Sequence, residues 1–259
     1  MTSRLFLICS SAAFRQNAAQ MSLPALWCTA TTTNMVDKTF LKLLQVCDST
    51  FPIGAFTLSN GLETYVQKGL VASGKDLRDY LRAWLSAQQR CDLAAAALAY
   101  EAAASPREIL LLDERTAAYK LPMEVREGSR KMCIRFLKLM KKIGISAAES
   151  YQKQIEAGRA VGQYPVAFGL YARMQGIAKE DAILVYAYNM CSAIVTGCVK
   201  LIPMSQTDGQ RVLYETLPAI EVAAKAALHV KPEALGLSLP GLDIRAMQHE
   251  RLYTRQYLS

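Results

Sequence analysis

Apolar residues recur at helical spacing along the chain from about residue 36 onward, and alternating, strand-like runs are nearly absent. A period of 3.6 residues is typical of amphipathic helices, so the pattern predicts an all-α fold. We expect a single globular domain of about eight to ten helices, with a loop-rich segment and a short helical or extended terminus after Lys231. The expected helices span residues 38–47, 59–68, 73–104, 106–119, 122–143, 146–157, 164–175, 179–202 and 205–228.

The most apolar of these helices is the one expected at 179–202. Its uncharged run, Ala182 to Val199, is at the lower limit of length for a membrane span. Charged residues bound it closely, and Asn189 and Ser192 lower its hydrophobicity. We therefore interpret it as the central, buried helix of the domain and expect no membrane span.

One segment interrupts the helical pattern. Residues 48–63, DSTFPIGAFTLSNGLE, combine glycine, proline and hydroxyl residues, and Gly54 and Gly61 allow backbone conformations that are closed to other residues. The segment predicts a shaped turn that exposes Phe51 and Phe56. An ordinary inter-helix loop is the alternative, because glycine and proline mostly mark turns.

This segment resembles the signature of the urease accessory protein F family (UreF), Ser-x-x-Phe-Pro-x-Gly-x-Phe/Tyr-x-x-Ser-x-Gly-Leu-Glu. The matching region contains Asp48, Ser49, Phe51, Pro52, Gly54, Phe56, Ser59, Gly61, Leu62 and Glu63. Two later stretches resemble the same family: VKLIPMSQTDGQ, residues 199–210, and LDIRAMQHERLYTRQYLS, residues 242–259, which is similar to the family ending HExLxxRLFxS. The terminus departs from that ending at Gln256. The resemblance spans about residues 36–259.

Members of this family act as assembly factors and not as catalysts. The resemblance therefore implies a helical scaffold that dimerises, binds urease accessory protein D/H, and with it recruits the accessory GTPase G to apo-urease. GTP would be bound and hydrolysed by that partner. Nickel would be handled by the complex, through a passage enclosed with protein D/H, and not held tightly by this chain.

The resemblance also implies roles for particular residues. Signature and terminal residues would contact a partner or support a partner surface, with 231–259 acting as a docking tail. The partner-binding candidates are Phe51, Pro52, Phe56, Ser59, Glu63, Met247, His249, Glu250, Leu252, Tyr253, Arg255 and Ser259. Candidates for a polar passage or a dimer contact are Lys200, Gln206, Asp208 and Gln210; a helix N-cap and turn is the alternative for that block.

The residues themselves indicate no covalent chemistry. His229 and His249 have no Cys, Asp or Glu at metal-ligand or triad spacing, and neither a Walker A sequence nor GxGxxG after a strand is present. We therefore expect no catalytic residue and no metal ligand. Two alternatives stay open: a metallochaperone that binds nickel through Cys191, Cys198 or the histidines, and a helical enzyme with a pocket lined by Tyr186, Tyr188 and Met190.

Charge and cysteine content add further expectations. The formal net charge is +8. The basic residues Arg130, Lys131, Arg135, Lys138, Lys141 and Lys142 cluster on one expected helix, which favours a solvated face over a surface for nucleic acid or an acidic protein. Seven cysteines without paired spacing indicate reduced, mostly buried thiols and a cytoplasmic protein.

Residues 1–34 are rich in Ser, Thr and Ala and contain no acidic residue. We expect either a misassigned start, with Met35 as the original initiator, or a targeting peptide. In both cases this extension is excluded from the fold.

Overall fold

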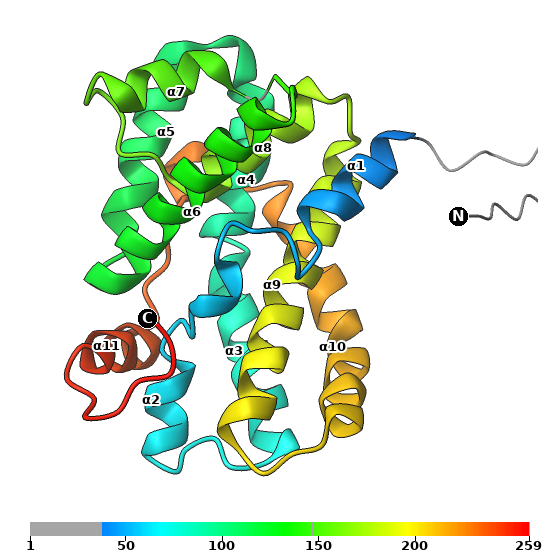
Figure 1. The fold of residues 1–259 in the computed structure, drawn as a ribbon, viewed down its shortest axis with the longest axis vertical. Helices are drawn as coiled ribbons and strands as arrows, with labels where there is room; N and C mark the ends of the chain where they lie inside the picture. Colours follow the sequence, from blue (N-terminus) through cyan, green and yellow to red (C-terminus); the bar gives the residue numbers. More distant parts are fainter. Residues whose placement is uncertain (1–37, 147, 259) are drawn as a thin grey trace, which may run out of the picture. The chain divides into compact units, whose positions relative to one another are not determined.

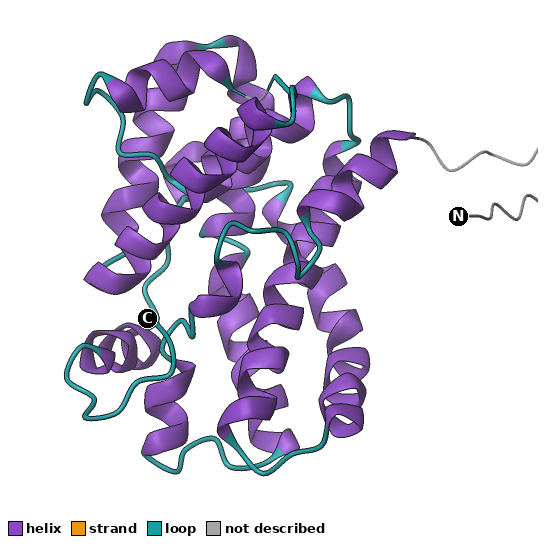
Figure 2. Cartoon of the chain, viewed as in Figure 1, coloured by secondary structure: helices purple, strands orange, loops and turns teal. Residues whose placement is uncertain are grey.

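The computed structural model describes residues 38–146 and 148–258 (Figure 1). No strand occurs in these two ranges, and the helices are joined by short loops (Figure 2). This confirms the predicted all-α fold. The described residues form one compact unit. The predicted N-terminal extension, 1–34, lies outside the described residues.

Most expected helices are found within a few residues of their predicted ends. The α-helices are α1 (Lys38–Val46), α2 (Leu62–Gln67), α3 (Gly74–Gln88), α4 (Asp92–Glu101), α5 (Pro106–Tyr119), α6 (Met123–Lys142), α7 (Glu149–Glu156), α8 (Tyr164–Met174), α9 (Lys179–Leu201), α10 (Gln206–Ala227) and α11 (Pro240–His249). Short 3₁₀ turns occur at η1 (Ala55–Thr57), η2 (Ala102–Ala104) and η3 (Pro232–Ala234). Ser73, Ser105 and Ser205 cap α3, α5 and α10 through their side-chain oxygens.

The apolar helix α9 lies at the centre of the unit. It contacts α10, α4, α2, α8, α1, α3 and η1, so neighbouring helices cover much of its length. Among the described helices, it is the one long and apolar enough to cross a membrane by length and composition. Its contacts on several sides explain that apolarity, and the prediction of a central core helix is confirmed.

The pair α4 and α8 packs unusually closely. Four consecutive alanines of α4, from Ala94 to Ala97, are buried, and Gly169 of α8 lies over this surface. A Cβ atom at Gly169 would overlap the carbonyl oxygen of Ala96 and lie 2.9 Å from the Ala99 Cβ atom. Small residues on both helices therefore allow their backbones to approach closely.

One predicted helix is wrong in its extent. The range 73–104 was expected to form a single helix, but it breaks between Gln88 and Asp92 into α3 and α4. The break is held by a distant loop: Gly236 N donates to Arg90 O (2.6 Å) and Cys91 Sγ lies 3.4 Å from Leu237 O. Tertiary contacts override the local helical pattern here.

The described cysteines are free thiols, as predicted. Cys91, Cys133, Cys191 and Cys198 are buried and Cys47 is half-buried. Burial raises the pKa of Cys91 to about 11 and the pKa of Cys191 and Cys198 to about 12, so these thiols stay protonated at neutral pH. Cys9 and Cys28 lie outside the described residues.

Candidate protein-docking site

The signature segment, residues 48–63, leaves α1 and reaches α2 through a turn that requires glycine. Gly54 and Gly61 both have φ of +87°, as their predicted special geometry requires. Each also faces a close neighbour: a Cβ atom at Gly54 would overlap the guanidinium group of Arg135, and one at Gly61 would lie 3.1 Å from Ala246 N. These two glycines bring the segment against α6 and α11.

The two phenylalanines of the segment have different environments. Phe56 is 57% exposed, as predicted. The predicted exposure of Phe51 is wrong: its side chain is buried, with its ring centroid 6.2 Å from that of Phe136 in α6. The Phe51 ring packs into the aromatic core beneath α6. Phe51 therefore fixes the segment to the body and does not present it to a partner.

Glu63, the last residue of the signature, is a buried acceptor for the end of the chain. It lies in the first turn of α2 and its residue is only 1% exposed. Its carboxylate accepts hydrogen bonds from the backbone N–H groups of Gln256 (2.8 Å) and Tyr257 (3.2 Å). The helix N-terminus also favours a negative charge at this position.

His249 joins this carboxylate to a second one. The ring is fully buried at the end of α11, with Nε2 2.9 Å from Glu63 Oε2 and Nδ1 2.6 Å from Glu124 Oε2. Both nitrogens can donate to these oxygens only when each carries a proton. Glu124, in the first turn of α6, also accepts a hydrogen bond from Arg255 Nη1 (2.7 Å).

We call Glu63, Glu124, His249 and Arg255 the tail anchor. Its residues come from α2, α6, α11 and the terminal segment, so one network connects elements that lie far apart in sequence. The anchor joins two carboxylates to the His249 ring and the Arg255 guanidinium, so each of these groups has a partner. Removing one member leaves a buried group without its partner, which is destabilising.

Further hydrogen bonds hold the terminal segment, residues 250–258, on the body. Tyr257 donates through its hydroxyl to Gly197 O of α9 (3.2 Å), and Leu258 N donates to Thr57 O of the signature segment (2.8 Å). Gln67 Nε2 donates to Thr254 O (2.8 Å). Burial and the Glu63 carboxylate raise the pKa of Tyr257. Residues 250–258 therefore follow a defined path beside α2 and α11 (Figure 1).

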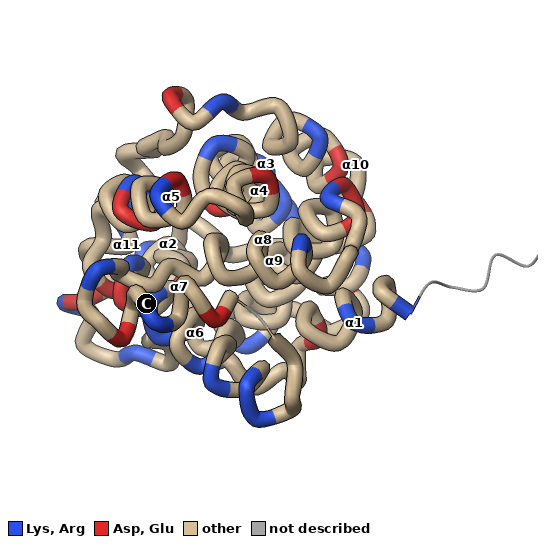
Figure 3. Tube along the Cα trace, turned by 90° about the horizontal axis from the view of Figure 1, so that it is seen from above, with Lys and Arg blue, Asp and Glu red and all other residues tan. Residues whose placement is uncertain are grey.

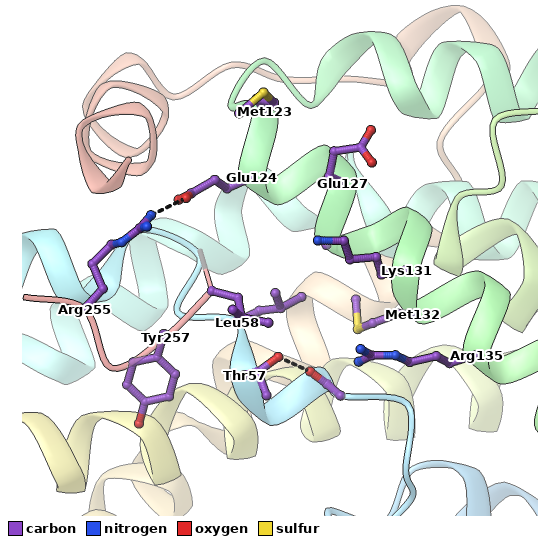
Figure 4. Close-up of a pocket in the computed structure, with 13 residues that line it drawn as sticks. Thr57, Leu58, Met123, Glu124, Glu127, Lys131, Met132, Arg135, Arg255 and Tyr257 are labelled. Carbon is purple, nitrogen blue, oxygen red and sulfur yellow. Dashed lines mark hydrogen bonds and ion pairs between the residues drawn. The ribbon is translucent and has the colours of Figure 1, made fainter. Parts of the chain in front are cut away.

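A groove of about 460 Å³ lies where the terminal segment, the signature segment and α6 meet. Figure 4 shows Arg255 and Glu124 at one part of its wall, Arg135 at another, and Leu58 and Met132 between them. The groove therefore combines charged rims with an apolar floor. Mixed surfaces of this type suit a protein side chain or backbone better than a small polar ion.

The predicted partner-binding residues divide into three groups. Glu63, His249 and Arg255 form the anchor, and Phe51 and Ser59 are buried supports. Exposed or half-buried positions are held by Pro52, Phe56, Met247, Glu250, Leu252 and Tyr253. Ser259 lies outside the described residues. Partner contact stays a prediction for all of them.

His249 was identified from its place in the terminal segment, and its burial between two carboxylates was not predicted. Its partners Glu63 and Glu124 lie 186 and 125 residues away in the sequence. No spacing rule connects residues at such separations, and Glu124 was missed altogether. The acidic first turn of α6 was the one available signal for Glu124, and it did not indicate a partner.

The block after α9 lies at the connection to α10. Lys200, Gln206 and Gln210 are exposed. Ser205 caps α10: Asp208 N donates to Ser205 Oγ (3.0 Å), and Ser205 Oγ donates to Asp208 Oδ2 (2.6 Å). The alternative of an N-cap and turn therefore describes the geometry in this chain, and a role in a passage or dimer contact stays a prediction.

The two described ranges contain no group of three or more His, Cys, Asp or Glu residues that is arranged to hold a metal ion. Cys191 and Cys198, the alternative nickel ligands, are buried in α9 with raised pKa values. His249 already has carboxylate oxygens against both ring nitrogens. These side chains are therefore engaged in the core or in the anchor.

Comparisons with known proteins identify the family. The UreF family model matches residues 71–217, more than half of the chain. The chain belongs to the UreF family. A relative from Actinobacillus pleuropneumoniae serotype 5b (strain L20), named urease accessory protein UreF, is 37% identical over 221 residues, which are 84% of this chain and 97% of the relative.

Two other UreF relatives show the same breadth of similarity. The protein of Haemophilus influenzae (strain PittGG) is 38% identical over 84% of this chain and 94% of its own length. That of Bacillus sp. (strain TB-90) is 34% identical over 85% of this chain and 98% of its own length. Both are named urease accessory protein UreF. The two segments that resemble the UreF signature and the UreF ending meet at the tail anchor.

Proposed function

We propose that this protein acts in urease maturation as a non-catalytic helical scaffold. It binds urease accessory protein D/H and the accessory GTPase G, and with them docks on apo-urease as a cytoplasmic, homodimeric component. Family membership and the names of the relatives support the role in maturation. The tail anchor supports the scaffold role.

The observation that carries this proposal is the contact of Glu63 with His249 and with the backbone of the terminal segment. This contact holds the last residues in one conformation before any partner arrives. A pre-ordered segment loses less conformational entropy on binding than a free tail does. The exposed side chains Met247 and Tyr253 are then available as contacts, and aromatic residues are common anchors of interfaces.

In this proposal the assembled complex, and not this chain alone, handles nickel and GTP. Nickel passes through the complex toward urease, and the partner GTPase binds and hydrolyses GTP. The exposed polar residues Lys200, Gln206 and Gln210 fit weak, transient contact with a hydrated ion or with a second copy. Replacing Cys191 and Cys198 by alanine is therefore expected to leave urease activation intact, whereas the metallochaperone alternative requires its loss.

Co-purification tests the scaffold role. The full chain is expressed with accessory proteins D/H and G and compared with a chain that lacks residues 251–259 and with the double variant Met247→Ala/Tyr253→Ala. We expect a stable complex with the full chain and its loss in both variants. Circular dichroism of each variant confirms that the helices are retained.

A matched control uses exposed residues far from the anchor. Tyr214→Ala/Val222→Ala removes two exposed apolar side chains from α10 and should leave the D/H contact unchanged. A full chain that fails to bind either accessory protein contradicts the proposal. Equal binding by the full chain and both tail variants contradicts the role of the terminal segment.

A further inference from the structure

The outer face of α6 carries an unpaired basic stripe. Lys131, Arg135, Lys138 and Lys142 are all exposed and succeed one another at intervals of four, three and four residues. This spacing places them on one side of a helix. Figure 3 shows Lys and Arg gathered along α6.

The charges of this stripe have no carboxylate partners among the described residues. Lys131, Lys138 and Lys142 form no ion pair there, and Arg135 Nη1 donates to the backbone oxygen of Ile53 (3.4 Å). Arg130, on another side of the helix, is paired with Glu127 at 3.4 Å. The stripe therefore keeps its full positive potential for a partner.

An apolar groove runs beside the second half of this stripe. It has a volume of about 500 Å³ and lies between α1, the signature segment and α6. Leu41 and Leu44 of α1 are 56% and 45% exposed, and Ile143 at the end of α6 is 45% exposed. Pro52 and Leu139 complete the apolar wall.

The groove and the stripe are adjacent because of their positions on α6. Leu139 and Ile143 line the groove, and each directly succeeds a stripe lysine, Lys138 or Lys142, in the sequence. Along its other edge the groove carries one acidic residue, Asp48, whose carboxylate accepts hydrogen bonds from Thr50. The groove is thus mainly apolar, with Gln45, Asp48 and Thr50 as its polar lining residues, and the basic side chains of Lys138 and Lys142 lie next to it in the sequence of α6.

We propose that this α1–α6 surface binds an acidic, amphipathic segment of a partner protein. Apolar side chains of the segment occupy the groove, and its carboxylates face the basic stripe. The second groove uses neither the tail anchor nor the terminal segment, whereas Lys131 and Arg135 of the stripe line the first groove. The second groove and the neighbouring Lys138 and Lys142 therefore form a second docking site on the scaffold. The signature segment lies between the two sites and contacts both.

Charge and shape select this occupant over others. In a two-fold symmetric contact, a second copy of this chain would bring the same basic residues to the interface and repel the stripe. Single-stranded nucleic acid needs aromatic rings for stacking, whereas the ring in this groove, Phe51, is buried. A helix with apolar residues at positions three and four apart and glutamates between them matches both parts of the surface.

A labelled model peptide tests the proposal on the full chain. The probe is a fluorescein-labelled peptide of about 18 residues, five helical turns, with leucine on one face and glutamate elsewhere. Fluorescence anisotropy should give saturable binding that weakens with salt. Lys138→Glu/Lys142→Glu should weaken binding by about tenfold or more, because like charges then face the peptide.

Two further variants locate the binding site. Lys68→Glu/Lys231→Glu makes the same change in net charge at exposed lysines outside the groove and should change the affinity less than about twofold. Leu44→Ser/Ile143→Ser keeps all charges and should also weaken binding by about tenfold, since it removes the apolar wall. These exposed positions leave the core unchanged.

Several results overturn the proposal. Equal weakening by Lys68→Glu/Lys231→Glu shows general charge attraction, and unchanged binding by Leu44→Ser/Ile143→Ser shows that the groove is unused. An unlabelled single-stranded DNA that displaces the peptide and binds more tightly identifies a nucleic-acid surface. A dimer in sedimentation that dissociates in Lys138→Glu/Lys142→Glu identifies a contact between copies. Failure of the D/H complex, in contrast, concerns the scaffold proposal alone.

Discussion

Two buried carboxylates in this protein hold backbone N–H groups of a distant segment, yet they do so in different settings. Asp113 of α5 and Glu63 of α2 are each 1% exposed. Asp113 accepts hydrogen bonds from the backbone N–H groups of residues 161–163 at 2.6, 3.1 and 2.8 Å and from Tyr151 Oη at 2.6 Å. Glu63 accepts from two backbone N–H groups and faces His249.

The two segments held in this way lie in different parts of the molecule. Residues 161–163 lead directly into α8, whose residues from Tyr164 to Ala172 are all buried. The segment held by Glu63 is the last stretch of the chain, and most of its side chains are exposed. The same chemistry therefore fixes the core in one place and holds an exposed surface segment in the other.

The largest expected effect comes from Asp113→Asn. The amide nitrogen replaces one of the two acceptor oxygens with a donor, so the groups that donate to that oxygen, such as the N–H groups of Val161 and Gly162, lose their acceptor. We expect the free energy of unfolding to fall by about 3 kcal/mol or more. Urea denaturation monitored by circular dichroism measures it. A loss below about 1 kcal/mol would remove the structural role given to Asp113.

Glu63→Gln should have a smaller effect on the whole protein and a large effect on the tail. It weakens the hold on the terminal segment and leaves the core in place, so trypsin should cleave after Arg251 and Arg255 much faster than in the parent chain. Glu250→Gln, an exposed neighbour, is the control and should leave cleavage unchanged. Similar cleavage in all three proteins would contradict a locked tail.

Alkaline titration can compare the two sites, because each contains a tyrosine with a raised pKa. Burial, then the charges of Cys133 and Asp113, raise the pKa of Tyr151 well above its usual value; burial and Glu63 raise the pKa of Tyr257. The folded tyrosines keep protons that the unfolded chain has lost. Their contribution to stability is complete below about pH 10 and decreases as pH rises above that value.

The measurement is phenolate absorbance in the parent chain and in Tyr151→Phe and Tyr257→Phe. Subtracting the absorbance of Tyr257→Phe from that of the parent chain gives the titration of Tyr257. Its phenolate should form before the protein unfolds, because this side chain is only partly buried. The same subtraction with Tyr151→Phe should show that the Tyr151 phenolate forms only when the protein unfolds. A Tyr151 phenolate in the folded protein would show that the Asp113 site opens as readily as the tail.

Tyr257→Phe is expected to have the smallest effect. It removes one hydrogen bond, to Gly197 O, and keeps the ring in place. The expected loss is about 0.5–1.5 kcal/mol in the stability of the docked tail, seen as a modest increase in tryptic cleavage. Tyr253→Phe, at a fully exposed ring, should show no change. Faster cleavage in Tyr257→Phe than in Glu63→Gln would contradict the expectation that Glu63 contributes more than the Tyr257 hydroxyl to the stability of the docked tail.

The helical pattern was enough to predict the fold class and the central helix, because both depend on local periodicity and burial. It failed at the break between α3 and α4, where residues 88–92 contain no glycine or proline. The contacts that hold that break, from Gly236 and Leu237, lie far away in sequence. The residues around the break do not indicate contacts with such distant residues.

The candidate site could also be predicted only in part from the sequence. Motif positions identified Glu63, His249 and Arg255 separately, but they could not show that these residues meet or that Glu124 joins them. Gln256, the departure from the family ending, shows the reason: its side chain is exposed, and it contributes to the anchor through its backbone N–H. A backbone contact of that kind is insensitive to the residue type.

Amide hydrogen exchange tests the tail anchor most directly. In the parent chain the N–H groups of Gln256 and Tyr257 should exchange slowly, because they donate to a buried carboxylate. In Glu63→Gln they should exchange much faster, while amides of α4 and α8 keep their protection. Fast exchange of both amides in the parent chain would show that the terminal segment is free, and would contradict a pre-ordered docking tail.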